Sequence, residues 1–388
     1  MMSSIPVDVQ EELIAFTQDL IRIKSVSGHE EQIIRFLAQK MQALGYDDVT
    51  IDAMGNLLGR IGYGSQSILF DSHVDTVDVP DEGAWSIPPF SGEIVDGCLY
   101  GRGSADMKSS VAASIYAGAL AKKMGWDAGK TIYVSCTVFE EDCDGENLKH
   151  LFHALDVRPD YVIICEPSDN HISLGHKGKA QVTLKTHGVS AHGSAPEKGL
   201  NAIYEMADII QRVERVNADL MKADHPRGSL ALTRISSTAA SLNAVPSACE
   251  IYLDRRIAPG ETEQAIRDEM DALIQGKRAT WDIEPLQRTS WTGLPISYRP
   301  FHLAWKIGPE HALTQACIAA YQVVFGRLPE GYIFWDFSTN AVTPVGLGIP
   351  TIGFGPGDYK LAHMRDEHIR VEQISQACDF YLRLIQQI

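Results

Sequence analysis

Seven acidic and histidine side chains stand where an apolar stretch ends or where glycines gather. His73 and Asp75 follow the apolar run Ile68-Leu69-Phe70 in ILFDSHVDTV. On a strand, residues i and i+2 point to the same face, so a histidine and a carboxylate at this spacing can share one task. Taken alone, the pair also fits a polar loop after a core strand. The other five are Asp106 in GRGSADMKSS, Glu140 and Glu141 in VFEEDCDG, Glu166 in IICEPS, and His363 in FGPGDYKLAHMRDEH.

Strand-like and helix-like segments alternate around these residues. Apolar, β-branched stretches at 67–73, 131–142 and 160–168 predict buried strands, and the spacing at 9–23 and 107–125 predicts helices. Ser27 and Glu30 have the spacing of a capping box at the start of another helix. Such alternation indicates an α/β fold with a mostly parallel sheet flanked by helices. Parallel strands end at one edge of the sheet, so the side chains that follow them are expected to converge there.

A metal centre is the simplest explanation for so many acids at one edge. Burying several carboxylates together without cations costs several kcal/mol each. Two histidines with three or four carboxylates suit zinc, manganese or cobalt. Because no cysteine belongs to this set, the pattern favours a catalytic site over a structural one.

The pattern of predicted strands and helices changes near Lys177. From there alternating strands and two helices succeed one another in the order strand, helix, strand, strand, helix, strand, which predicts a small α+β domain. The alternation of strand-like and helix-like segments resumes at Pro295. We therefore expect a metal-binding catalytic domain made of residues 1–177 and 295–388, with residues 178–294 inserted into it.

Composition narrows the choice of partners and location. The 388 residues carry a net charge of −16, which argues against nucleic acid or an anionic membrane as a partner. No apolar run reaches the roughly 20 residues that a membrane-spanning helix needs. Seven dispersed cysteines without CxxC spacing, and a first segment without a signal-peptide pattern, favour a cytoplasmic protein.

The whole chain resembles the M20 metallopeptidase family, which includes acetylornithine deacetylase, succinyl-diaminopimelate desuccinylase and glutamate carboxypeptidases. The matching pieces are HVDTV, GRGSADMK, FEED, CEPS, GVSAHGSAPEKGLNAI and GFGPG…AH…DEH, in this order. The stretches EEDCDG, DRR and WDFSTNAV are most similar to a branch called selenium-metabolism-linked hydrolases. The resemblance implies that the inserted domain is a dimerisation or lid domain.

The resemblance also implies two divalent metal ions, with zinc expected first and manganese or cobalt as alternatives. Asp106 would bridge both ions. His73 and Glu166 would complete one ion's ligands, and Glu141 and His363 those of the other. The peptide bond after Asp106 would be cis.

The resemblance implies catalytic roles for two further side chains. Asp75 would hydrogen-bond His73 and fix its tautomer. Glu140 would act as the general base toward a metal-bound water.

Substrate contacts are expected from the inserted domain. The resemblance implies that His192 reaches the active site of the other subunit in a homodimer and donates to the oxyanion. Asn243 and Arg256 resemble residues that bind substrate, although a surface ion pair explains Arg256 equally well. The GFGPG turn, residues 353–357, is expected to supply backbone N–H groups beside the site.

The resulting expectation is a two-metal hydrolase of a linear amide bond. Its substrate would be an N-acyl or N-carbamoyl amino acid, or a short peptide cut as by an exopeptidase. The alternative is a non-catalytic metal-binding relative that binds small molecules or protein partners.

Overall fold

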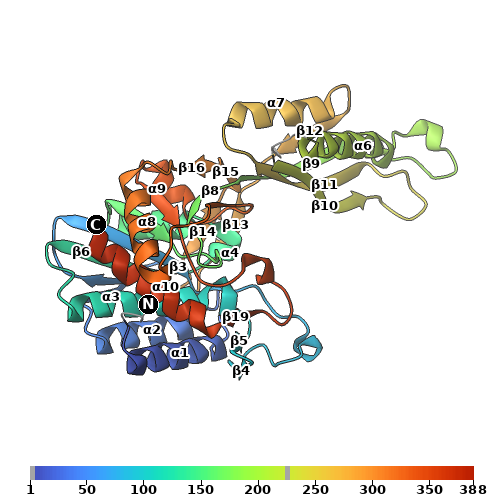
Figure 1. Cartoon of the computed structure of the whole chain (residues 1–388). Helices are drawn as coiled ribbons and strands as arrows, with labels where there is room; N and C mark the ends of the chain where they lie inside the picture. The colour runs from blue at the N-terminus through green and yellow to red at the C-terminus, as the bar shows by residue number, and fades with distance from the viewer. Residues whose placement is uncertain (1–4, 223–227) are drawn as a thin grey trace.

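A nine-stranded sheet forms the larger part of the molecule in the computed structural model, which describes residues 5–222 and 228–388 (Figure 1). The strand order is β1-β2-β6-β3-β7-β18-β8-β16, and β17 pairs with β8. The central strands β6, β3, β7 and β18 are parallel to one another, which confirms the predicted mostly parallel sheet. Its strands are β1 (Asp48–Ile51), β2 (Leu57–Ile61), β3 (Gln66–His73), β6 (Lys130–Thr137), β7 (Tyr161–Ile164), β8 (Ser173–His176), β16 (Trp305–Lys306), β17 (Ile333–Trp335) and β18 (Thr351–Gly353).

Helices cover both faces of this sheet, because its central strands are apolar on both sides. In β3, Ile68 and Phe70 belong to one buried cluster and Leu69 to another on the opposite face. Such strands read as continuous apolar runs. The first face is covered by α1 (Val7–Arg22), α2 (Glu31–Ala43), α3 (Ser109–Lys123), α8 (Ala312–Phe325) and α10 (Val371–Gln387), and the second by α5 (Glu146–Ala154) and α9 (Val342–Gly346).

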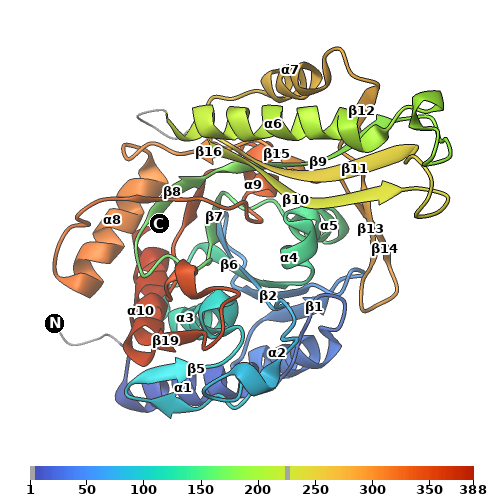
Figure 2. The same ribbon diagram turned by 90° about the vertical axis from the view of Figure 1, so that its right-hand side faces the viewer.

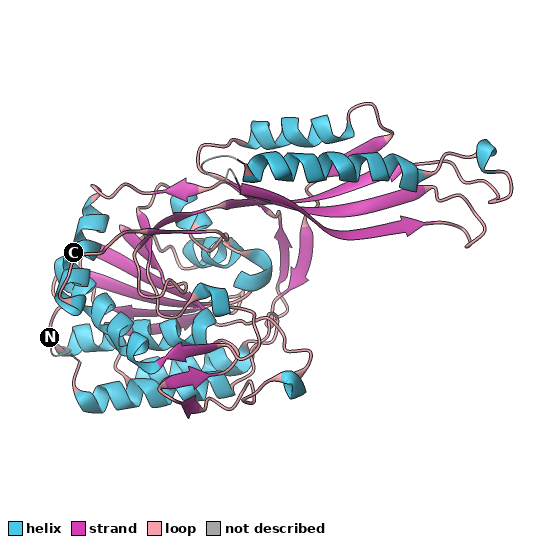
Figure 3. Ribbon diagram, turned by 45° about the vertical axis from the view of Figure 1, so that its right-hand side comes forward, coloured by secondary structure: helices cyan, strands magenta, loops and turns pink. Residues whose placement is uncertain are grey.

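A second, antiparallel sheet stands beside the first and has its own apolar core (Figures 1 and 3). Its order is β10-β11-β9-β12, and two helices cover one of its faces (Figures 2 and 3). We call residues 178–282 the small sheet unit. It contains β9 (Gly178–His187), α6 (Ala202–Met221), β10 (Gly228–Thr238), β11 (Ala248–Ile257), α7 (Glu263–Ile274) and β12 (Ala279–Asp282).

Two crossovers connect the sheets, and they run side by side. On the way out, β8 passes directly into β9 at Lys177. On the way back, β15 (Phe301–His302) pairs with β9, and β16 pairs with β8. A hairpin of β13 (Leu286–Thr289) and β14 (Pro295–Tyr298) precedes β15. The predicted domain boundary after residue 294 falls inside this hairpin, so the division into domains stays a prediction.

Short elements complete the part of the chain that the structure describes. A three-stranded sheet consists of β4 (Ile94–Val95), β5 (Cys98–Tyr100) and β19 (His368–Arg370), and the short helix α4 (Glu140–Cys143) follows β6. Among the described helices, none combines the length and apolar character needed to cross a membrane.

Candidate metal centre

The predicted metal ligands and Glu140 meet at the carboxyl edge of the parallel strands. His73, the last residue of β3, lies opposite Thr137, the last residue of β6. Glu166 follows the end of neighbouring β7 by two residues. The convergence follows from strand direction, because parallel strands bring their carboxyl ends to one edge.

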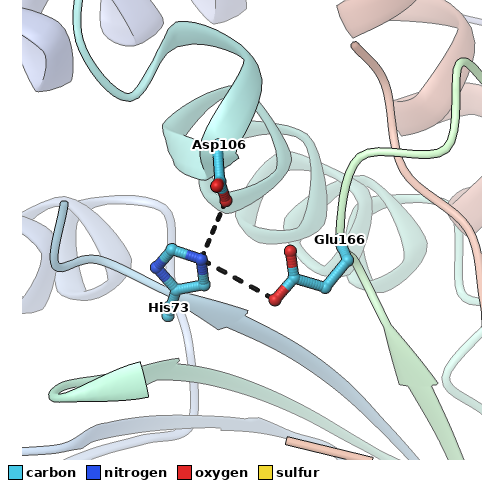
Figure 4. A group of neighbouring side chains, drawn as sticks. All are labelled: His73, Asp106 and Glu166. Atoms are coloured by element: carbon cyan, nitrogen blue, oxygen red, sulfur yellow. Dashed lines mark hydrogen bonds and ion pairs between the residues drawn. The ribbon is translucent and has the colours of Figure 1, made fainter. Parts of the chain in front are cut away.

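One half of the site consists of His73, Asp106 and Glu166 (Figure 4). His73 Nε2 lies 3.0 Å from Asp106 Oδ1 and 3.7 Å from Glu166 Oε1. All three side chains are buried, and they come from a strand end, the start of a helix and a loop. Their ligand atoms lie within 4.8 Å of one another, close enough to share one metal ion.

The other half uses the second oxygen of Asp106. His363 Nε2 lies 2.9 Å from Glu141 Oε2 and 3.4 Å from Asp106 Oδ2. Asp106, Glu141 and His363 again offer atoms within 4.8 Å of one another. Asp106 thus presents one carboxylate oxygen to each half, which is the placement expected of a bridging ligand.

The chemistry of this donor set fits two divalent cations. Burial raises the pKa of Glu166 well above its usual range, and burial followed by the charge of Asp106 raises that of Glu141. Hydrogen bonds to Asp106 and Glu141 raise the pKa of His363 to about 10. These shifts reflect negative charge crowded into a buried place, where bound cations would compensate it. Oxygen and imidazole nitrogen are donors that zinc, manganese and cobalt accept.

Asp75 occupies the predicted place beside His73 but acts through a different atom. Its backbone oxygen lies 2.9 Å from His73 Nδ1, whereas its carboxylate oxygen is 3.8 Å away. The carboxylate instead accepts the backbone N–H groups of Glu140, at 3.0 Å, and Glu141, at 3.2 Å. Asp75 therefore orients both the imidazole and the pair of glutamates.

Glu140 lies in the cavity without belonging to either ligand group. Its Oε1 is buried and has no hydrogen-bond partner among the described residues. Burial and then the charge of Glu166 raise the pKa of Glu140 well above its usual value. Phe139, just before it, has φ 60°, in the left-handed region that side chains adopt at a cost of about 1–2 kcal/mol. At this residue the backbone leaves the direction of β6 and enters the short helix α4, in which Glu140 and Glu141 are the first two residues.

The predicted capping box is wrong, and its two residues support the site instead. Glu30 has no side-chain capping bond to the start of α2. Its buried Oε1 accepts N–H groups from Gly28, at 2.9 Å, and Phe139, at 3.2 Å. Ser27 Oγ donates to Asp75 Oδ2 at 2.7 Å. Both side chains thus hold the residues that position Glu140, a role that only the tertiary fold reveals.

Loss of the Glu30 anchor is expected to slow catalysis. Glu30→Ala removes the acceptor of the Phe139 N–H and should lower kcat by roughly 10-fold with metal content unchanged, because misplaced groups lose rate steeply. Burial and the charge of Asp75 raise the pKa of Glu30 to about 8, so at pH 7 a neutral group accepts these bonds. Glu30→Gln is therefore expected to keep most of the activity. Steady-state kinetics of both variants checks this, and equal losses would show that an amide cannot replace the carboxyl group.

Sequence reasoning also missed a buried ion pair behind the metal ligands. Glu367 Oε1 accepts the backbone N–H groups of Ala105, at 2.9 Å, and Asp106, at 3.0 Å, while Oε2 pairs with Arg102. Arg102 also donates to the backbone oxygen of His363 at 3.3 Å. The pair thus holds the segments of Asp106 and His363 together. Its signal in the sequence is weak, since the two partners are 265 positions apart.

Two other expectations near the ligands have different outcomes. The Asp106–Met107 peptide bond is cis, as the resemblance implied. The GFGPG turn packs against the Glu166 loop rather than offering Gly355 to substrate, because the Gly355 N–H bonds Ser168 Oγ at 2.9 Å. A Cβ at Gly355 would lie 2.4 Å from the backbone oxygen of Glu166, which explains the glycine.

The metal ligands line a cavity of about 330 Å³ that includes Arg256. Arg256 Nε and Nη2 bind the carboxylate of Asp254 at 2.7 and 3.1 Å. The ion pair that was the alternative explanation for Arg256 is therefore present, and a substrate contact by this cavity-lining residue stays a prediction. The cavity is also lined by Asp144, Lys179, Phe337, Ser338 and Tyr359, which sequence reasoning did not select.

His192 and Asn243 lie apart from this cavity, in exposed segments of the small sheet unit. His192 Nδ1 accepts from Ser194 Oγ at 2.7 Å, and Gly193 N–H donates to Asn243 O. The segment between β9 and α6, which carries His192, lies at the end of the small sheet unit farthest from the large sheet (Figure 1). Neither residue is among the described residues that line the metal cavity of this chain.

Comparisons with known proteins agree with this geometry. The family model described as Peptidase family M20/M25/M40 matches residues 69–387. The uncharacterized protein YgeY of Escherichia coli (strain K12) is 35% identical over 364 residues, covering 93% of this chain and 90% of that protein. The succinyl-diaminopimelate desuccinylase of Stenotrophomonas maltophilia (strain R551-3) is 28% identical over 388 residues, covering 97% and 99%. The M20 family metallo-carboxypeptidase Sso-CP2 from Sulfolobus solfataricus shares the fold, with a TM-score of 0.75 at 16% identity over 97% of this chain and 98% of that one. The chain therefore belongs to peptidase family M20/M25/M40 and is a metal-dependent hydrolase.

Proposed function

We propose that the protein hydrolyses a linear amide bond with two divalent cations and with Glu140 as general base. The observation that carries this proposal is the placement of Asp106, whose two oxygens face His73 and Glu166 on one side and Glu141 and His363 on the other. Zinc is the proposed metal, with manganese or cobalt as alternatives that suit the same donors.

The mechanism follows from the groups around the cavity. Two bound cations would polarise the scissile carbonyl and lower the pKa of a water molecule toward neutrality. Glu140, with its unpartnered Oε1, takes the proton from the attacking water and later delivers it to the leaving amine. Asp75 keeps the base in place through the Glu140 N–H.

A free carboxylate on the amine-side fragment is the proposed anchor of the substrate. Asp254 occupies the Nε–Nη2 edge of Arg256, while Nη1 has no partner among the described residues. The Nη1–Nη2 edge can therefore bind a second carboxylate in a fork-shaped, charge-assisted pair. We propose an N-acyl or N-carbamoyl amino acid, or a short peptide cut as by an exopeptidase, as the substrate class. Asn243 is proposed as a further substrate contact.

A panel of N-acyl amino acids, N-carbamoyl amino acids and dipeptides tests this function. A charge-assisted pair is worth roughly 2–3 kcal/mol, so amidating the substrate carboxylate should cost about 30- to 150-fold in kcat/KM. In Arg256→Ala the same amidation should cost little. Equal penalties in both proteins would place the carboxylate elsewhere, and no hydrolysis of any linear amide would refute the function.

We also propose a homodimer in which His192 acts on the site of the partner subunit. The strand β10 is an edge of the small sheet, and its Ile235 is 53% exposed. His192 is exposed and does not reach the cavity of its own chain, which suits a role across a dimer. An exposed edge strand is a surface that a second copy can extend.

Mixing two inactive variants is expected to restore activity if His192 acts in trans. A His192→Ala chain keeps its own Glu140 and receives an intact histidine from a Glu140→Gln partner. After subunit exchange, about a quarter of wild-type activity should return, since half of the dimers are mixed and each has one complete site. Absence of recovery after demonstrated exchange would contradict the trans role.

The proposed location is the cytoplasm. All seven cysteines are free thiols in the structure, and six of them are buried. Thiols that remain reduced are typical of that compartment.

A further inference from the structure

One buried carboxylate, that of Asp144, contacts both crossovers between the two sheets. Its side chain is 3% exposed, and its Oδ1 lies 2.7 Å from Lys179 Nζ. The hydroxyl of Tyr298 donates to the same oxygen, and His302 Nε2 lies 3.1 Å from that hydroxyl. Lys179 lies at the start of β9, where the outgoing crossover enters the small sheet unit. Tyr298 is the last residue of β14, just before the returning crossover, and His302 in β15 pairs directly with Lys179.

The same carboxylate belongs to the turn that carries the base and a metal ligand. Asp144 stands three residues after Glu141, in the segment 140–145. Loop residues beside the large sheet fix both ends of this turn: Asp75 accepts the first two N–H groups, and Asn340 Oδ1 accepts the N–H of Gly145 at 2.8 Å. Between these anchors the side chain of Asp144 faces the crossovers.

A second contact of the turn reaches the same side of the molecule. Asp142 Oδ2 lies 2.7 Å from Arg288 Nε, on the hairpin that precedes the returning crossover. This pair is partly exposed and contributes little on its own. The buried pair of Asp144 is different, because separating Lys179 from it would leave an unpaired charge inside the protein.

We propose that Asp144 is a positioning residue that locks the Glu140–Glu141 turn to both crossovers, so that the placement of the small sheet unit and the alignment of the base are coupled. The proposal rests on the proposed function in its kinetic consequence. Its structural consequence stands independently, because the coupling is a property of the turn whatever the substrate.

Tyr298→Phe is the cleanest test, since it removes one hydroxyl from the network and Tyr298 is not among the described residues that line the metal cavity. We expect kcat to fall by roughly 10-fold while KM changes by less than about 2-fold and metal content is unchanged, because a misplaced base loses rate rather than binding. Tyr46→Phe is the matched control, as it removes a buried hydroxyl that donates to Ile115 O at 2.8 Å, away from the turn.

Hydrogen exchange of the protein as purified provides the second readout. In Tyr298→Phe and in Asp144→Asn, amides of residues 140–145 should exchange faster than in wild type, while Tyr46→Phe leaves them unchanged. Unchanged exchange in this segment, or equal acceleration in the Tyr46→Phe control, would overturn the proposal. An unchanged kcat in Tyr298→Phe would overturn it as well. If the wild-type protein hydrolyses no amide, the proposed function fails, and the exchange measurement alone decides the coupling.

Discussion

Replacing Glu140 by glutamine is expected to lower kcat by at least about 100-fold while both cations remain bound. Glutamine keeps the size of the side chain and removes its basicity, so the water loses its proton acceptor. The structure supports retention of metal, because Glu140 belongs to neither of the two groups of ligand atoms. Steady-state kinetics together with elemental analysis of the same sample checks both parts.

The control for this variant is Glu146→Gln, which changes an acid on the nearby helix α5 that is outside the metal cavity. It should leave kcat within about 2-fold of wild type. A loss of metal in Glu140→Gln comparable to the loss of activity would instead make Glu140 a ligand.

Replacing Asp106 by alanine is expected to remove both metal and activity. Asp106 is the one residue shared by the two groups of ligand atoms, and its oxygens approach His73 and His363 at 3.0 and 3.4 Å. Without it, each half retains two side chains, fewer than the three protein ligands that a catalytic zinc usually has. Elemental analysis should show less than one ion per chain, in contrast to two in wild type.

Asp106→Asn separates charge from shape in this experiment. The amide keeps one oxygen donor and loses the negative charge that a bridging position requires, so it should retain at most one ion. A variant of Asp106 that keeps both ions and activity would refute the bridging assignment.

The convergence of the candidate metal ligands could be predicted from the sequence because each follows an element with a clear signature. His73 and Glu166 end apolar, β-branched strands, and the direction of parallel strands decides where such residues meet. Asp106 and His363 lie in glycine-containing segments whose order matches the family. In these cases local sequence and fold class together fix the position of the side chain.

Residues that support the ligands could not be predicted in the same way. Ser27 and Glu30 have the spacing of a helix cap, but bonds to Asp75 and Phe139 override that local preference. Tyr298 lies 154 positions from Asp144, and no periodic pattern links the two. These contacts depend on how the crossovers pack, which the sequence does not encode locally.

Arg256 shows a signal that was present but ambiguous. Asp254 and Arg256 stand two residues apart on β11, so their side chains share a face, and the ion pair between them follows from the strand. Strand periodicity does not show which edge of the guanidinium group remains available to bind a substrate. That depends on the wall of the cavity, which forms only in the folded chain.

Metal titration of the chelator-stripped protein, with metal content and amide hydrolysis measured on the same samples, tests the central claim most directly. Wild-type protein should bind two divalent ions per chain and recover hydrolysis of linear amides as the two sites fill. Full activity without metal, or two bound ions with no turnover across the whole panel of acylated amino acids and dipeptides, would contradict a two-cation hydrolase.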